Sequence, residues 1–343
     1  AEVRNLSDNV GLCEVNGFNR IEITGSDRHR FLDRPTCGIV PKKSGRVGLA
    51  YLLNDHGMLK AEATVANIPA SDRGPERCWY GSAAASEFHD MDWLQGHLAP
   101  DEDVQLRSLT NDQTILVLAG PKARSVLSAA SRGDWSRNAF PWLSVRECFI
   151  GFAPATVMGV SFSGELAYEI HIPNASLYAA YTALRAAGAA FDLKLFGARA
   201  VESMRLEKGF LHWKSDILTE FDPFETGLSR FVALDRKDNF IGHDALIERQ
   251  GKGPARSLVT LKVDNDTAPV HPGASLFQGN DVVGTATSGD WGHRVGANLA
   301  YAFVRPEVAA QGTVLDIDMC GEIVKAEVIA SCPYDPDYAR MRS

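Results

Sequence analysis

The stretch Val160–Ile172 reads VSFSGELAYEIHI and carries the pattern from which the fold can be worked out. A Ser-Gly turn near its middle separates two predicted short strands, and after the turn apolar side chains alternate with small or polar ones. This alternation places Tyr168 on the apolar face and Glu169 on the opposite face. Because antiparallel sheets often keep one face in water, the first interpretation of Glu169 is a solvent-facing residue. The alternative is a carboxylate placed to hold a ligand, and alternation alone does not decide between the two.

The size and composition of the chain indicate a soluble protein of more than one domain. At 343 residues it is long for a single hydrophobic core, which favours two or three domains. Hydrophobic residues make up 45% and charged residues 23%, as in ordinary globular proteins. The net charge of −8 argues against a general nucleic-acid-binding protein, which would carry a basic face.

The cysteines and histidines give no sign of a metal site. The six cysteines include no C-x-x-C pair and the nine histidines no H-E-x-x-H motif, so no metal is expected. No apolar run is long enough for a membrane span, and the first residues lack the basic-then-apolar plan of a signal peptide. We therefore expect a cytoplasmic protein without membrane contacts.

The hydrophobic pattern changes along the chain at a short linker. Before it, strand and helix patterns are mixed, with strands expected at 47–53, 58–66 and 113–119 and helices at 174–187 and 197–208. The segment Gly251–Pro254 is the best linker candidate. After it, residues 257–331 read as short strands with Gly, Asp and Asn turns, which predicts a small β-barrel-like domain.

Motifs for nucleotide binding or hydrolysis are missing. No G-x-G-x-x-G follows a strand and no G-x-x-x-x-G-K-[ST] is present, so dinucleotide and P-loop sites have no support. The run Gly159–Ser163 approaches the G-x-S-x-G nucleophile elbow but lacks the last glycine, so a hydrolase triad is not expected.

Four groups of segments, in a fixed order, carry a family resemblance. They are LLNDHGMLKAEATV (52–65); FSGELAYEI (162–170); SMRLEKGFLHW (203–213) with PFETGL (223–228) and NFIGHDAL (239–246); and ATSGDWGHRVGANLAYAFV (286–304) with YDPDYARMRS (334–343). Together they resemble the aminomethyltransferase family typified by the glycine-cleavage T-protein. The EKGFLHW run and the final ten residues are most similar to the folate-binding portion of dimethylglycine and sarcosine dehydrogenases and oxidases.

The resemblance implies an α+β fold of three lobes, arranged as a cloverleaf around a central folate channel. Residues 1–250 would form two interleaved α+β lobes, one from approximately 1–50 with 150–250 and the other from 51–149. Residues 251–343 would form a C-terminal β-barrel or jelly-roll-like lobe. The resemblance also implies tetrahydrofolate as the bound cofactor.

The resemblance assigns the pterin ring of the folate to Glu169. A pterin offers adjacent N–H donors, and a carboxylate accepts two of them side by side. Phe162 and Tyr168 are grouped with Glu169 as folate-binding residues. Related flavoprotein domains often carry Tyr at the position of Phe162, which can stack on a flat ligand but cannot donate a hydrogen bond. Glu165, in the same segment, is expected to face solvent.

A second acid follows the turn at 54–57. The T-protein carries paired aspartates there, and the matching residues are Ala61 and Glu62. The resemblance implies that Glu62 exchanges a proton as a folate nitrogen attacks a one-carbon electrophile, whereas the alternative is an exposed strand glutamate.

Three further residues complete the expected site. T-proteins place an arginine on the helix at 197–208, where the aligned residue is Val201, and Arg199 is expected to substitute for it. The alternative for Arg199, Arg205 and Lys208 is a set of solvated helix charges. Trp213 and Trp291 are candidates for flat walls of the channel, with core packing as the alternative.

The resemblance implies a tetrahydrofolate-dependent one-carbon transferase of N-methyl amine catabolism, which forms 5,10-methylene-tetrahydrofolate from an iminium or formaldehyde equivalent. Its substrate would be a small methylated amine, oxidised by a flavin-dependent oxidoreductase partner or module. One alternative is an O-, S- or N-demethylase that transfers a methyl group and forms 5-methyl-tetrahydrofolate, with a methyl ether or sulfonium as further possible donors. Another is a folate-binding sensor or scaffold without turnover.

Overall fold

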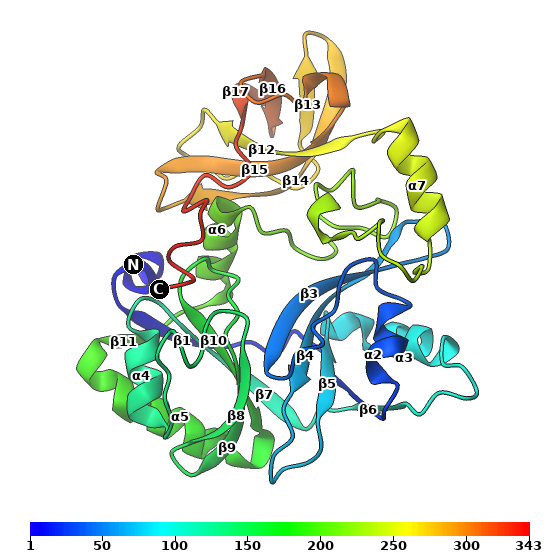
Figure 1. Cartoon of the computed structure of the whole chain (residues 1–343). Helices are drawn as coiled ribbons and strands as arrows, with labels where there is room; N and C mark the ends of the chain where they lie inside the picture. Colours follow the sequence, from blue (N-terminus) through cyan, green and yellow to red (C-terminus); the bar gives the residue numbers. More distant parts are fainter.

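The computed structural model describes all residues, 1–343, and builds them around three separate β-sheets. Two sheets are open and lie in lobes that also contain helices, and the third closes into a barrel near the C-terminus (Figure 1). The expected α+β fold with a C-terminal barrel is therefore confirmed. No helix combines the length and apolar character that crossing a membrane requires.

The first lobe contains a six-stranded sheet in the order β11-β1-β7-β10-β9-β8. Its strands are β1 (Val10–Glu14), β7 (Gln113–Ala119), β8 (Val145–Ile150), β9 (Ala153–Met158), β10 (Ala167–Pro173) and β11 (Leu193–Leu195). Its helices are α1 (Glu2–Asp8), α4 (Ala123–Ala130), α5 (Leu177–Gly188) and α6 (Ala198–Lys208), with 3₁₀ turns η2 (Asn174–Ser176) and η3 (Ala189–Phe191). The strand at 113–119 and the helices near 174–187 and 197–208 thus lie where the sequence predicts them.

Strand β10 shows why the opening stretch matters for the fold. Its apolar face, which includes Tyr168 and Ile170, is buried against α4 and α5. The opposite face is not in water, because Ala167 packs under α1 and α6 while His171 is covered by the second lobe. The strand expected before the turn does not form: residues 159–166 are a loop in which Gly164 has φ +79°.

The second lobe contains a five-stranded antiparallel sheet in the order β3-β4-β5-β2-β6. The strands are β2 (Ile21–Thr24), β3 (Arg46–Leu53), β4 (Leu59–Ile68), β5 (Arg77–Gly81) and β6 (Gln105–Ser108), with α2 (Arg28–Asp33), η1 (Ala84–Ser86) and α3 (Glu87–Gly96). The predicted hairpin at 54–57 is present, since Asn54 N–H donates to Met58 O at 3.0 Å and Gly57 has φ +73°.

The barrel closes in the order β12-β15-β14-β13-β16-β17. Its strands are β12 (Ser257–Val263), β13 (Ser275–Gln278), β14 (Asp281–Gly292), β15 (Ala297–Val304), β16 (Val314–Met319) and β17 (Glu322–Ile329), with η5 (Pro306–Val308). Between α6 and the barrel the chain forms η4 (Ser229–Phe231) and α7 (His243–Lys252). Inside the barrel, 16 buried apolar residues form one cluster, so this lobe has its own core.

The open sheets divide the first 250 residues differently from the expected lobes. Strands β2 and β3, expected to lie in the lobe of 1–50 with 150–250, pair with β5 and β4. Strands β7 and β8, expected in the lobe of 51–149, belong to the sheet of β10. The expected lobes were wrong because alternation identifies a strand but not its partner. Strand β1 pairs with β7, where Cys13 lies opposite Val117, and β7 is far away in the sequence.

Helix α6 lies between the first lobe and the barrel, and its charges are buried. Arg205 and Lys208 are almost inaccessible, so their interpretation as solvated helix charges is wrong. Lys208 Nζ lies 3.0 Å from Asp335 Oδ2 in the C-terminal segment, and Arg205 Nη1 lies 2.6 Å from Asp216 Oδ2. A cationic helix can be buried here because each ammonium or guanidinium group has a carboxylate partner.

Glu165 also differs from its expected position. Only 1% of the residue is exposed, and its carboxylate contacts Arg294 at 2.8 Å and Arg340 at 2.7 Å. These two arginines come from the β14–β15 connection and from the C-terminal segment, which lies close to the N-terminus (Figure 1). Glu165 therefore joins the first lobe to the barrel and to the end of the chain.

Candidate functional site

Glu169 lies where the two open sheets face each other. It occupies the middle of β10, between Met158 of β9 and Val117 of β7. The side chain of Glu169 is 27% exposed, and a neighbouring polar atom is His171 Nε2, 3.4 Å from Oε2. No protein donor forms a standard hydrogen bond with this carboxylate, so its lone pairs remain available to a ligand.

A small cavity borders Glu169 on the side of the second lobe. It measures about 40 Å³ and includes Thr64 of β4, Trp79 of β5 and Met158 in its lining. That volume holds a water molecule but not a pterin ring. A ligand bound by Glu169 would therefore have to reach the exposed side of its carboxylate.

Glu62 comes from the facing sheet and has the electrostatic character of a proton-transfer group. It lies on β4 two residues before Thr64, and therefore on the same face of the strand. Burial raises the pKa of Glu62 to about 7, and the nearby charge of Asp216 acts in the same direction, whereas a hydrogen bond from Tyr51 lowers it. A carboxyl group with this pKa can either accept or donate a proton at neutral pH.

Asp216, which influences Glu62, is held in place by a set of donors that the sequence pattern did not reveal. It is fully buried and accepts hydrogen bonds from Arg205 Nη1 at 2.6 Å, Thr287 Oγ1 at 2.5 Å and Ser288 Oγ at 2.6 Å. The backbone N–H of His212 adds a further bond at 2.9 Å. The donors come from three separate segments. The sequence analysis singled out only Arg205 among them, and charge patterning assigned that residue to solvent.

Phe162 starts a row of aromatic rings beside the C-terminal segment. Its ring, which is 38% exposed, lies parallel to that of Phe210, with centroids 6.2 Å apart and planes 11° apart. Phe210 is followed by Tyr338 at 6.3 Å, and Tyr338 by Trp142 at 6.1 Å. The exposed Phe162 ring thus offers a flat apolar surface without a hydroxyl group.

Tyr168 does not lie near Glu169, although the two are adjacent in the sequence. It is buried on the opposite face of β10, with Trp135 and Phe140 around it. Its hydroxyl group has no hydrogen-bond partner. The expectation that Tyr168 contacts the ligand of Glu169 is therefore not met, because successive strand residues point to opposite faces.

The other expected residues are dispersed. Arg199 is exposed in the first turn of α6 and has no polar partner, while Val201 is partly buried in the cluster under this helix. Trp213 packs into the apolar cluster that joins β3, the 217–228 segment and the barrel. Trp291 is partly buried on β14, where its backbone oxygen accepts from Ser203 Oγ of α6 at 2.6 Å.

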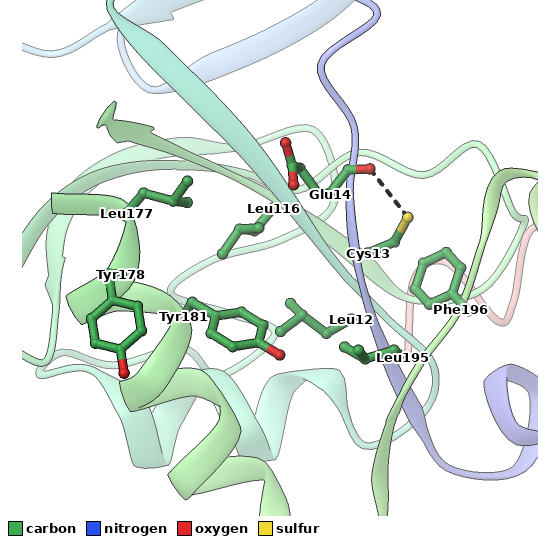
Figure 2. A pocket seen from close by; sticks show the side chains of 9 residues that line it. All are labelled: Leu12, Cys13, Glu14, Leu116, Leu177, Tyr178, Tyr181, Leu195 and Phe196. Atoms are coloured by element: carbon green, nitrogen blue, oxygen red, sulfur yellow. Dashed lines mark hydrogen bonds between the residues drawn. The ribbon is translucent and has the colours of Figure 1, made fainter. Parts of the chain in front are cut away.

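A larger pocket lies elsewhere on the first lobe, and Figure 2 shows its lining. It measures about 440 Å³ and is bounded by Leu12, Cys13, Glu14, Leu116, Leu177, Tyr178, Tyr181, Leu195 and Phe196. Glu14 is its only charged residue, and Cys13 Sγ donates to the Glu14 carbonyl oxygen at 3.2 Å (Figure 2). Because neither Glu62 nor Glu169 lines it, this pocket does not unite the two acids.

Comparison with known proteins places the whole chain in one family. The profile of the GCVT N-terminal domain matches residues 1–236, and that of the glycine cleavage T-protein C-terminal barrel domain matches residues 256–335. Human mitochondrial dimethylglycine dehydrogenase is 29% identical over 330 residues, which cover 96% of this chain and 37% of the human protein. The chain thus spans little more than a third of that relative.

Shorter relatives match along most of their length. The aminomethyltransferase of Bacillus subtilis (strain 168) is 26% identical over 324 residues, which cover 93% of this chain and 86% of that protein. The crystal structure of the glycine cleavage system aminomethyltransferase T from Bartonella henselae has the same fold, with a TM-score of 0.85 and 23% identity over 99% of this chain and 89% of that one. From the two matched profiles, we conclude that the chain belongs to the glycine-cleavage T-protein family, which is of the folate-dependent aminomethyltransferase type.

Proposed function

We propose that this protein is a tetrahydrofolate-dependent one-carbon transferase of N-methyl amine catabolism. It would form 5,10-methylene-tetrahydrofolate from an iminium or formaldehyde equivalent. Family membership supports the folate, and the similarity to dimethylglycine dehydrogenase supports the amine. The observation that carries the proposal is the carboxylate of Glu169, which is partly exposed and has no standard hydrogen bond within the protein.

Glu169 and Phe162 each offer a group that fits a pterin in chemical terms. A pterin presents adjacent N–H donors, and a carboxylate with free lone pairs accepts two of them. The exposed ring of Phe162 offers a stacking surface for a flat ligand, although without a hydroxyl group. Tyr168 is not part of this proposal, since it lies on the other face of β10.

Glu62 would move the proton that the reaction requires. Bound tetrahydrofolate supplies nucleophilic nitrogens that take up the carbon. Glu62 would accept a proton as the nitrogen attacks and return one when the product forms, which its pKa of about 7 allows. The hydroxyl of Tyr51 donates to Glu62 Oε1 at 2.7 Å and fixes the orientation of the carboxyl group.

The oxidation of the N-methyl amine is assigned to a flavin-dependent oxidoreductase. Relatives that match this chain over 37% and 35% of their length are named dimethylglycine dehydrogenase and sarcosine oxidase subunit alpha, the latter from Rhizobium meliloti (strain 1021). The present sequence lacks a G-x-G-x-x-G strand-turn-helix motif for such a cofactor. A bound acceptor close to the site of oxidation would capture the carbon before it escapes.

One departure favours a second candidate function. Ala61 stands where the family resemblance places another acid, so the acid pair is incomplete. A demethylase that transfers an intact methyl group and forms 5-methyl-tetrahydrofolate requires different proton transfers. A folate-binding scaffold requires no proton transfer. Mass analysis of the folate product from a carbon-13-labelled N-methyl amine, supplied with a flavin-dependent amine dehydrogenase, separates these functions.

The binding half of the proposal is tested by titrating tetrahydrofolate into the wild type and the Glu169→Ala variant. Loss of a charged hydrogen-bond acceptor should weaken binding by roughly 10- to 100-fold. Glu14→Ala is the matched control, because Glu14 lies in the same sheet but is exposed and lines the other pocket. Equal affinity of wild type and Glu169→Ala would contradict the proposal.

A further inference from the structure

We infer that His171 and Arg20 are positioning residues for Glu169, with Arg20 selecting the histidine tautomer that presents an N–H group to the carboxylate. The inference rests on the proposed role of Glu169 as the pterin anchor and extends it to two residues behind the carboxylate. The resemblance assigned neither residue a role.

The three side chains form a line that runs from the open side of Glu169 into the protein. His171 Nε2 lies 3.4 Å from Glu169 Oε2, and His171 Nδ1 lies 3.4 Å from Arg20 Nη1. The Arg20–His171 contact is at the long end of the hydrogen-bonding range, whereas the His171–Glu169 pair is close in distance without hydrogen-bond geometry, so these contacts set orientation more than they add stability. Arg20 is itself held by the carbonyl oxygen of Gln113, 3.3 Å from Nη2.

The surroundings keep this line of residues in place. His171 and Arg20 are 4% and 3% exposed, respectively. The ring of Trp79 lies edge-on to the imidazole, with centroids 5.6 Å apart, and approaches it from the facing sheet. His171 and Glu169 share one face of β10 because they are two residues apart, so the strand fixes their spacing.

The tautomer follows from the chemistry of the two neighbours. A guanidinium group can donate but not accept, so the nitrogen that faces Arg20 must be an acceptor without a proton. Burial lowers the pKa of His171, although the nearby Glu169 carboxylate opposes this effect, and the ring is therefore neutral at neutral pH. Its single proton then lies on Nε2, which faces Glu169 Oε2.

The environment of Arg20 is unusual for an arginine side chain. It is buried without a carboxylate in contact, a situation that normally costs stability. Burial lowers the pKa of Arg20, and the negative charge of Glu169 is the largest influence in the opposite direction. Arg20 thus provides positive charge behind a carboxylate that a pterin would approach from the front.

Two independent measurements test the inference. Nitrogen-15 NMR of histidine-labelled, folate-free protein reads the tautomer of His171 directly, with the signal assigned by its absence in the His171→Gln variant. We expect a neutral ring protonated at Nε2 in the wild type and a mixture of tautomers in Arg20→Gln, whose amide can accept as well as donate. A wild-type ring protonated at Nδ1, or charged at neutral pH, overturns the inference.

Tetrahydrofolate titration supplies the second measurement. A glutamine amide nitrogen can replace Nε2–H, whereas an asparagine amide nitrogen reaches only the position of Nδ1, so His171→Gln should retain affinity and His171→Asn should lose about tenfold. Thermal denaturation of both variants shows that they are folded. Equal affinities for the two variants, alongside weakened binding by Glu169→Ala, overturn the inference alone. Unchanged binding by Glu169→Ala overturns the proposed function, and the inference with it.

Discussion

Tyr51 and Glu62 are direct cross-strand partners in the β3–β4 ladder, and the tyrosine hydroxyl donates to Glu62 Oε1 at 2.7 Å. Tyr51 packs against Phe231 in the apolar cluster shared with the 217–228 segment and the barrel, so the sheet register itself places an ionisable carboxyl group beside this cluster. Burial raises the pKa of Glu62 to about 7, and the hydrogen bond limits the rise. The pair can therefore be examined by replacing either member.

Replacement of Glu62 by glutamine should separate binding from chemistry. The amide keeps the size of the side chain but cannot exchange a proton, so folate affinity should change little while turnover falls by about 10²- to 10⁴-fold. In the wild type, activity limited by the basic form of Glu62 should rise with pH through about 7. This rise should be absent from the residual activity of Glu62→Gln, and its persistence would assign the proton to another group.

Replacement of Tyr51 by phenylalanine should move the same titration. The hydroxyl group stabilises the charged carboxylate and thereby lowers its pKa, so its removal should raise the pKa of Glu62 above the wild-type value of about 7. The pH–rate profile should shift towards higher pH, with the maximal rate retained once Glu62 is deprotonated. An unshifted profile would show that the bond is not formed in the active state.

The raised pKa of Glu62 also predicts a pH-dependent cost to stability. The folded protein keeps the Glu62 proton between the unfolded pKa and about 7, whereas the unfolded chain has lost it. Stability should therefore fall as pH rises through this window. The free energy of unfolding of Glu62→Gln minus that of the wild type should be larger near pH 8 than near pH 5, by about 1 to 3 kcal/mol. Denaturant melts at the two pH values measure this difference, with Glu14→Gln as a control that should show none.

Local patterns in the sequence predicted the elements of the fold better than their connections. A compact apolar run located β7 with its observed bounds, and the 54–57 turn located the β3–β4 hairpin. The division into lobes was wrong because β1 pairs with β7 across a separation that no local pattern encodes. Glycine and polar turns after residue 251 predicted the barrel, although only three of its six strand pairings, β13–β14, β14–β15 and β16–β17, join neighbours in sequence.

The resemblance and the structure bear differently on the individual residues of the proposed site. The resemblance pointed to Glu169, and the structure leaves its carboxylate free of standard hydrogen bonds. Charge patterning failed for Arg205 and Glu165, because burial and pairing across lobes decide whether a charged residue is solvated. Asp216 and His171 were missed for the same reason, since their importance lies in contacts with distant segments.

Alanine should affect stability at one glutamate of this segment and folate binding at the other. Glu165→Ala removes one of the two carboxylates that pair with the buried guanidinium of Arg294, the other being Glu207, and should destabilise the protein by about 1.5 to 3 kcal/mol. Glu169→Ala removes a partly exposed carboxylate with no standard hydrogen bond, and should lower the melting temperature less than Glu165→Ala does while weakening folate binding. Thermal denaturation and folate titration of both variants give this crossed pattern, which equal destabilisation would contradict.

Replacement of Tyr168 by phenylalanine tests whether that residue belongs to the core alone. Its hydroxyl is buried without a hydrogen-bond partner, and the ring packs among Trp135 and Phe140 on the face of β10 away from Glu169. Removing an unsatisfied buried hydroxyl should leave stability unchanged or raise it by about 1 kcal/mol. Folate affinity should equal that of the wild type. A loss of affinity with an intact melting temperature would contradict the assignment of Tyr168 to the core alone.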